Sequence, residues 1–386
     1  MSMTLSERVR DHAPLALTVF LAAGLLPTLR AMQLPLRFDW GTYFRAYWMG
    51  LALKSLFATA LLVVIGFPYA EGFGPLLDRY RRQKLRFLFL LPLVLLLCLL
   101  NGPLVGLLLS VDAIALLEYL DRLRESQTLA TAAAQDILIP ATLLFFGLIV
   151  VFGYNDVIAA RRYFAPQEYW LNRLDSLLLG GATIPALAHR AFAAWGAQVF
   201  QALDFIYFEM FPQIGAALAL TAVRLGRRRA MRFVGTILLA YYIALVCFWL
   251  VPATGPYFIC RDHFAVLPRG QRVYAVQAAT LANLHTLWSG NQKERIGLDY
   301  FIALPCMHIT QPLIVMWFLR PWRRILAVLA AFNVLVAAST LLLEQHYLVD
   351  LLGGVATALL AIALTDGPPG GSPGSKESAG RAGNGK

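Results

Sequence analysis

Apolar stretches of about 20 residues, separated by short polar segments, recur along most of the 386-residue chain. A helix needs roughly 20 apolar residues to cross the hydrocarbon core of a bilayer, so each stretch predicts a membrane-spanning helix. We therefore predict an all-α, multi-pass membrane protein with about ten transmembrane helices. The predicted spans lie at approximately residues 14–33, 47–67, 87–100, 102–120, 136–154, 200–223, 231–251, 301–319, 325–343 and 347–364.

The composition excludes a water-soluble enzyme. Apolar residues make up 59% of the chain and charged residues only 14%, whereas soluble domains carry about a quarter charged residues. The four cysteines are spread over the whole length, which excludes a disulfide-framework domain. At the C-terminus the sequence is rich in Gly, Pro and Ser, and we predict that residues 366–386 form a disordered cytoplasmic tail.

The basic residues are concentrated between the apolar stretches. The chain has 33 Lys and Arg against 22 Asp and Glu, a net charge of +11. Short basic loops of this kind are retained in the cytoplasm and orient the helices, so we attribute the charge to topology and expect no nucleic acid partner. The three clusters consist of Arg79, Arg81, Arg82, Lys84 and Arg86; of Arg224, Arg227, Arg228, Arg229 and Arg232; and of Arg320, Arg323 and Arg324.

Cytoplasmic placement of these clusters determines the direction of the later spans. Residues 231–251 then run outward, 252–300 form an outer loop, and 301–319 run inward. With ten spans both chain termini are cytoplasmic. The segment Pro305–His308 and His346 are then predicted to lie at the extracytoplasmic face of the cell membrane, on the same side and at the same depth.

Two of the six histidines lie at the ends of apolar helices, where polar side chains are costly and tend to be functional. These are His308 and His346. Asp350 follows His346 by four residues, so on a helix the two side chains share one face. The carboxylate would accept the proton of one ring nitrogen and leave the other nitrogen as a nucleophile. Gly353 and Gly354 permit close packing of this helix.

The segment Pro305–His308 supplies the second half of the candidate site. Pro305 starts or kinks a helix at its outer end, so the amides of the next turn lack partners and can bind an anion. His308 would stand beside this anion and protonate the oxygen that leaves. Neither a three-histidine nor a histidine–carboxylate ligand set can be assembled from these segments, so we expect no metal and no other cofactor.

The residues around the two histidines resemble motifs of the type 2 phosphatidic acid phosphatase (PAP2) superfamily. Its second motif, Pro-Ser-Gly-His, is matched by PCMH at Pro305–His308. Its third motif is Ser-Arg, five residues, His, three residues, Asp. Ser339 and Thr340 match its start, and His346 and Asp350 follow at the same spacing. We find no counterpart of the first motif, Lys, six residues, Arg-Pro, at the outer end of the preceding span.

Within the superfamily, the chain is most similar to the inositolphosphotransferase branch, which contains the inositol phosphorylceramide synthases. The sequence HYLVDLLGG, ending at Gly354, has the HYxxDxxxG form of that branch, and VPATGPYF at 251–258 resembles its loop. The resemblance implies a six-helix PAP2-like bundle within a catalytic membrane domain at 135–365. Residues 1–134 form an N-terminal transmembrane extension that the resemblance does not cover.

The resemblance implies a phosphohistidine mechanism. His346 would attack the phosphorus atom, Asp350 would orient His346, and His308 would protonate the leaving alkoxide. An acceptor hydroxyl or water would then take the phospho-group from His346. The substrate would be a membrane lipid with a phosphate-containing headgroup.

Further residues are candidates for binding the phosphate. Cys306, Met307 and Thr340 occupy motif positions at the phosphate, although the superfamily usually has Ser at 306 and phosphatases have Arg at 340. Phosphoryl transfer depends on positive charge around the equatorial oxygens. Lys293 and Arg295, shortly before the second motif, are the candidates for that charge.

These inferences predict a membrane phosphotransferase that moves a phospho-headgroup between lipids or polyols. Hydrolysis by a lipid phosphatase is one alternative. Another is a transporter or lipid-binding protein in which His308, His346 and Asp350 relay protons or bind a headgroup. A disulfide between Cys260 and Cys306 is a further alternative, since it would tie the outer loop to the active-site helix and remove the thiol from the phosphate.

Overall fold

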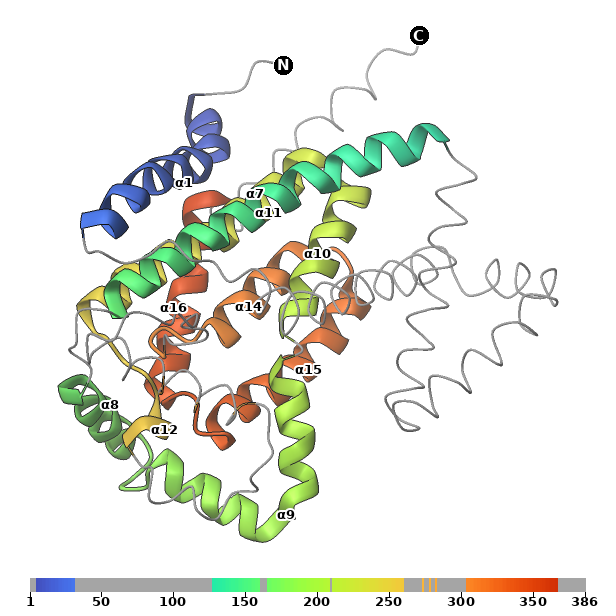
Figure 1. Ribbon diagram of the computed structural model, residues 1–386. Coiled ribbons are helices and arrows are strands. Elements are labelled where there is room, and N and C mark those ends of the chain that lie inside the picture. Colours follow the sequence, from blue (N-terminus) through green and yellow to red (C-terminus); the bar gives the residue numbers. More distant parts are fainter. Residues whose placement is uncertain are drawn as a thin grey trace, which may run out of the picture.

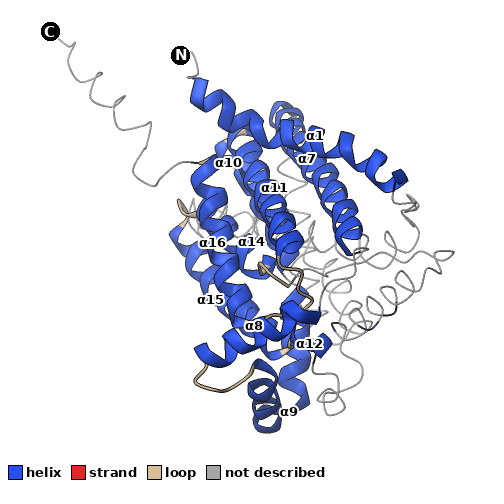
Figure 2. Ribbon diagram, turned by 90° about the vertical axis from the view of Figure 1, so that its left-hand side faces the viewer, coloured by secondary structure: helices blue, strands red, loops and turns tan. Residues whose placement is uncertain are grey.

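The computed structural model describes residues 5–31, 127–159, 165–208, 210–259 and 303–366, together with positions 273, 278 and 282. Every regular element in this part of the chain is a helix (Figures 1 and 2). The predicted all-α class is therefore confirmed for the described residues. In chain order the helices are α1 (Leu5–Ala31), α7 (Gln127–Ala159), α8 (Ala165–Leu178), α9 (Ile184–Phe208), α10 (Met210–Leu225), α11 (Arg227–Leu250), α12 (Pro256–Ile259), α14 (Met307–Leu319), α15 (Arg323–Leu342) and α16 (Leu348–Thr365).

Most of the predicted spans coincide with apolar helices. Among the described residues, four helices are long and apolar enough to cross a membrane, namely Ile184–Ala222, Arg227–Leu250, Arg323–Leu342 and Leu348–Thr365. Shorter apolar helices cover Ala13–Leu25, Ile139–Asn155 and Met307–Leu319. The predicted spans 47–67, 87–100 and 102–120 lie outside the described residues. The total of ten spans and the six-helix bundle therefore stay predictions.

The predicted span 200–223 differs from the structure at its beginning. The helix starts earlier, at Ile184 in α9, and it is interrupted at Gly196, whose φ of 76° and ψ of 176° are not helical. Glycine adopts positive φ at little cost because it has no Cβ. The helical segment that follows this break starts close to the predicted residue 200, and the segment before it, from Ile184 to Trp195, lies outside the predicted span.

Helix α8 falls outside all predicted spans because it has only 14 residues and contains charged side chains. Its two faces differ sharply. Glu168, Leu171 and Asp175 are buried against the protein. The opposite face is apolar and exposed, as is typical of helices that lie along a membrane interface. The exposed apolar residues are Tyr169, Trp170, Leu174, Leu177 and Leu178, and Arg173 is exposed among them.

Helix α11 is the centre of the described bundle. It packs against α7, α10, α14 and α16, and Figure 1 shows α7 running alongside it. Phe233, Ile237 and Leu238 of α11 are completely buried. Phe233 also packs edge-on against Phe318 of α14, with ring centroids 5.3 Å apart. This packing holds α14, whose first turn carries His308.

The described part of the predicted N-terminal extension packs on the same bundle. The hydroxyls of Thr18 in α1 and Tyr242 in α11 share a hydrogen bond of 2.6 Å. Tyr154 of α7 donates a hydrogen bond of 3.1 Å to the carbonyl of Leu21. The predicted boundary between residues 134 and 135 falls inside α7, so a single helix joins the two predicted domains.

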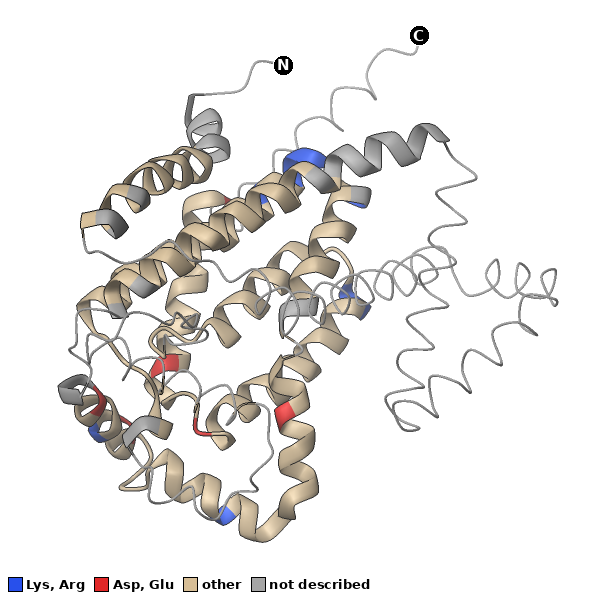
Figure 3. Ribbon diagram, in the orientation of Figure 1, with Lys and Arg blue, Asp and Glu red and all other residues tan. Residues whose placement is uncertain are grey.

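Most of the described arginines lie in two clusters, while Arg173 and Arg190 lie on α8 and α9 (Figure 3). Arginines gather where α10 meets α11 and where α14 meets α15. Asp366, which follows α16, lies at this basic end, where it pairs with Arg229 and accepts a 2.8 Å hydrogen bond from Nε1 of Trp317. The buried acidic residues of α8 and of the first turn of α16 lie towards the opposite end, where the candidate site is found.

Candidate active site

Two segments that are distant in the sequence meet where α14 and α16 begin. α14 starts at Met307, and not at 301 as predicted, because Cys306 caps it in an extended conformation. The amide of Cys306 donates to the carbonyl of Asp350 at 2.9 Å, and the hydroxyl of Thr310 donates to the carbonyl of Gly354 at 2.9 Å. A Cβ on Gly354 would lie 2.5 Å from the carbonyl oxygen of Cys306. Glycine is therefore required for this close helix packing, as the sequence indicated.

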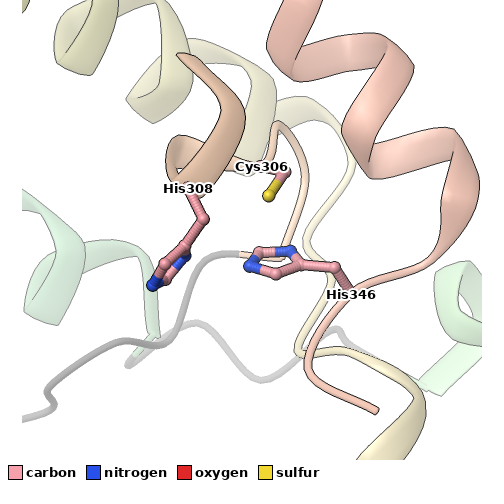
Figure 4. Close-up of side chains that lie close together, drawn as sticks. All are labelled: Cys306, His308 and His346. Carbon is pink, nitrogen blue, oxygen red and sulfur yellow. The ribbon is translucent and has the colours of Figure 1, made fainter. Parts of the chain in front are cut away.

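The two candidate histidines lie in one buried cluster with Cys306. The ring centroids of His308 and His346 are 5.5 Å apart. The exposed fraction of the surface is only 5% for His308 and 4% for His346. Figure 4 shows both imidazoles and the Cys306 thiol side by side. The thiol is free. His308 also stacks on Tyr207 of α9, with centroids 4.1 Å apart. The two imidazoles are thus close enough to contact one phosphoryl group.

A backbone carbonyl orients the ring of His346. Nδ1 lies 2.9 Å from the carbonyl oxygen of Ala303. Because a carbonyl can only accept, Nδ1 carries a proton, and in the neutral ring Nε2 then carries the lone pair. We expected Asp350 to accept this proton, but its Oδ2 is 3.6 Å from Nδ1, which is longer than a hydrogen bond. The physical reason is that His346 precedes α16, while the Asp350 carboxylate caps that helix by accepting the amide of Tyr347 at 2.8 Å.

The turn that carries His346 is held by the end of α15. The carbonyl of Thr340 accepts the amides of Gln345 and His346, at 3.0 and 3.2 Å. The hydroxyl of Thr340 donates to the carbonyl of Ala337 in its own helix, at 2.7 Å. Thr340 thus supports the histidine turn through its backbone, and its contact with phosphate stays a prediction.

A buried carboxyl group lies in the same turn. Glu344 is only 2% exposed and has a positive φ of 56°. Burial raises the pKa of Glu344 to about 8, so the group is mostly uncharged at pH 7. Its carbonyl accepts the amide of Tyr257 in α12, at 3.1 Å. The turn is therefore fixed from both sides, by α15 and by the loop that follows α11.

Glu168 of α8 joins that loop to the start of α16. Its carboxylate accepts the amide and the hydroxyl of Thr254, the amide of Gly255 at 3.3 Å and the hydroxyl of Tyr347 at 2.9 Å. Burial raises the pKa of Glu168 to about 7, although the hydrogen bonds from Thr254 and Tyr347 act in the opposite direction. Gly255 has a φ of 106°, and a Cβ there would lie 2.4 Å from the carbonyl oxygen of Gln345. The VPATGPYF loop thus packs directly on the histidine turn.

Asp175, also on α8, caps α16 from outside. Its carboxylate oxygens accept the amides of Leu348 and Val349 at 2.7 and 2.9 Å. These amides belong to the first turn of the helix, where no carbonyl of the same helix is available. Sequence motifs gave no sign of Glu168 or Asp175. The sequence did contain one signal for them: Glu168 and Asp175 lie seven positions apart, and so on the same face of a short amphipathic helix.

We expect Asp175→Ala to destabilise the protein by about 1–3 kcal/mol, because it leaves two partly buried amides without an acceptor. The loosened start of α16 should also lower turnover. Thermal unfolding of the purified protein in detergent measures the first effect. Asp175→Asn, which keeps one acceptor oxygen, should have a smaller effect, and Arg173→Ala, on the exposed face of the same helix, should have none. Equal losses for the Ala variants at 175 and 173 would contradict the capping role.

The remaining predicted phosphate-binding residues are distributed as follows. Met307 is the first residue of α14, and its side chain packs in the apolar core. Lys293 and Arg295 lie outside the described residues, and so does Cys260. The roles of these residues stay predictions.

The sequence model of the PAP2 superfamily matches residues 170–364, from within α8 to the end of α16. The matched segment contains both histidine segments and the helices that position them. The chain belongs to the PAP2 superfamily. No curated protein and no solved structure gives a significant match. Membership indicates a membrane phosphatase or phosphotransferase that acts on phosphate-containing lipids. The PAP2 match begins later than the predicted domain start at 135.

Proposed function

We propose that this PAP2 protein is a phosphotransferase of the inositolphosphotransferase-like branch, which transfers a lipid phospho-headgroup through a phosphohistidine at His346. The observation that carries the proposal is the pairing of the two imidazoles, with ring centroids 5.5 Å apart in a buried cluster. The Nδ1 of His346 donates to Ala303, so its Nε2 lone pair is available to attack phosphorus.

The reaction proceeds in two steps. In the first, Nε2 of His346 forms a bond to phosphorus, the bond from phosphorus to the donor oxygen breaks, and His308 gives its proton to the leaving alkoxide. In the second, an acceptor hydroxyl attacks phosphorus, the phosphorus–nitrogen bond breaks, and His308 takes the proton of that hydroxyl. The carboxylate of Asp350, 3.6 Å from Nδ1 of His346, stabilises the positive charge that the ring acquires.

Binding of the phosphate oxygens is assigned to the first turn of α14 and to the outer loop. The amide of Cys306 already donates to the carbonyl of Asp350, so the amide of Met307, at the positive end of the helix dipole, is the backbone donor assigned to the phosphate. Lys293 and Arg295 supply the positive charge that the transition state requires. The Thr at position 340, where phosphatases have Arg, favours a phosphodiester headgroup, which carries less charge than a phosphomonoester.

The site faces the extracytoplasmic side in this proposal. Its support is the separation of the site from the two described arginine clusters, which lie at the other end of the bundle. Basic loops remain in the cytoplasm, so the histidines would open towards the outer leaflet.

Trapping the covalent intermediate tests the proposal. Brief incubation of the purified protein with a donor lipid that is radiolabelled in its phosphate should label the protein. The label should be acid-labile and base-stable, as expected for phosphohistidine. It should be absent from His346→Ala and present in His189→Ala, which alters an exposed histidine of α9. A wild-type protein that turns over donor without ever carrying label would contradict the phosphohistidine.

A chase of the labelled protein separates transfer from hydrolysis. Addition of a hydroxyl-bearing lipid acceptor should release the label as a new lipid, at a rate that rises with acceptor concentration. Release as water-soluble phosphate, at a rate that is independent of acceptor, would identify a phosphatase.

A further inference from the structure

The catalytic cluster contains a thiol, that of Cys306, whose sulfur the proposed reaction does not use. Cys306, His308 and His346 each offer one ligand atom, a thiol sulfur or a ring nitrogen, and these atoms all lie within 4.8 Å of one another. All three residues are buried. Figure 4 shows them converging from the start of α14 and from the turn before α16. One thiol and two imidazoles form a donor set typical of zinc sites.

The geometry is close to that of a bound tetrahedral ion. Zinc binds sulfur at about 2.3 Å and nitrogen at about 2.0–2.1 Å, so its ligand atoms lie roughly 3.5 Å apart. The three atoms lie within 4.8 Å of one another, so they would have to move closer together on binding. The ring of His346 already has the support that metal-binding histidines need, because its Nδ1 donates to the Ala303 carbonyl and its Nε2 lone pair is available. The fourth position is left for water.

We propose that Cys306, His308 and His346 form a binding site for zinc or a similar thiophilic divalent cation, and that the bound ion inhibits the protein. On binding, the thiol loses its proton and its sulfur bonds to the metal, while each imidazole donates a ring lone pair. The lone pair of His346 is then no longer available to phosphorus. Cation binding goes beyond the proposed function and does not depend on it. Only the inhibition rests on the proposed function.

Titration of the full-length protein in detergent with cobalt(II), a spectroscopic substitute for zinc, tests the binding. One ion per chain should bind with a near-ultraviolet sulfur-to-cobalt charge-transfer band. Cys306→Ser should lose this band and bind cobalt at least about tenfold more weakly. Cys247→Ser, which alters the free cysteine of α11, is the matched control and should keep the band.

A second variant makes this result independent of any folding defect in Cys306→Ser. The triple substitution Cys98→Ser, Cys247→Ser and Cys260→Ser leaves Cys306 as the only cysteine and should retain the full band. Loss of the band in this variant, or its persistence in Cys306→Ser, would overturn the site.

Two further measurements test the inhibition. Inorganic phosphate should raise the apparent dissociation constant for cobalt, because both occupy the space between the imidazoles. Micromolar zinc should suppress turnover, and a chelator should restore it. The inhibitory assignment is overturned if phosphate leaves cobalt binding unchanged or strengthens it. It is also overturned if a chelator abolishes turnover and zinc restores it. Cobalt binding needs no turnover, so its outcome is separate from that of the phosphohistidine.

Discussion

His346→Ala is expected to reduce turnover of a phosphate-containing lipid by at least about 10⁴-fold, because removal of a nucleophile eliminates the covalent route. The fold should survive this change. The backbone bonds of the turn, from the amides of Gln345 and His346 to Thr340, do not involve the imidazole. The lost side-chain contacts include the hydrogen bond to Ala303 and the ring contact with His308. Initial rates on donor lipid in mixed micelles, together with thermal unfolding, measure both effects.

His189→Ala is the control for the general effect of removing a histidine, since His189 lies exposed on α9. It should retain wild-type rates. A His346→Ala protein that is folded and fully active would show that another group attacks phosphorus. A protein that loses its helical unfolding transition would be uninformative about chemistry, and His346→Gln, which is closer in size, would then replace it.

His308→Ala is expected to lower the rate by about 10²–10⁴-fold, the usual contribution of a general acid. The loss should depend on the leaving group. A lipid alkoxide is a strong base and needs a proton as it leaves, whereas an aryl oxide of low pKa leaves without one. With an aryl phosphate or phosphodiester substrate, the same variant should therefore lose less than about tenfold. Rates on both substrate types, for wild type and variant, measure this difference.

A conservative change nearby separates the proton transfer from packing. Tyr207 stacks on the His308 ring with centroids 4.1 Å apart, so Tyr207→Phe keeps the stacking surface. Any loss of rate in Tyr207→Phe should be the same on alkyl and aryl substrates. If His308→Ala loses the same factor on alkyl and aryl substrates, the role of His308 is to position substrate and not to donate a proton.

Most helices of the described chain could be predicted from the sequence, because the transfer of apolar side chains from water into lipid dominates their energetics. The apolar stretches at 231–251, 325–343 and 347–364 match α11, α15 and α16 within a few residues. The pairing of His308 with His346 could also be anticipated, since charge topology placed both at one membrane face. Gly354 was expected to allow close packing, and its position against the Cys306 carbonyl agrees with this.

The hydrogen bonding of the site could not be predicted in this way. Every residue has a carbonyl, so no sequence pattern indicates that Ala303 would accept the proton of His346. The support from Glu168 and Asp175 was equally hidden, because α8 is too short and too polar to register as a span. Local sequence sets which helices form and which of their ends carry reactive groups. The packing of the helices decides which backbone atoms and distant carboxylates hold those groups in place. The reason is that such contacts join residues far apart in the sequence: Ala303 and His346 are 43 positions apart, and Glu168 and Tyr347 are 179 positions apart.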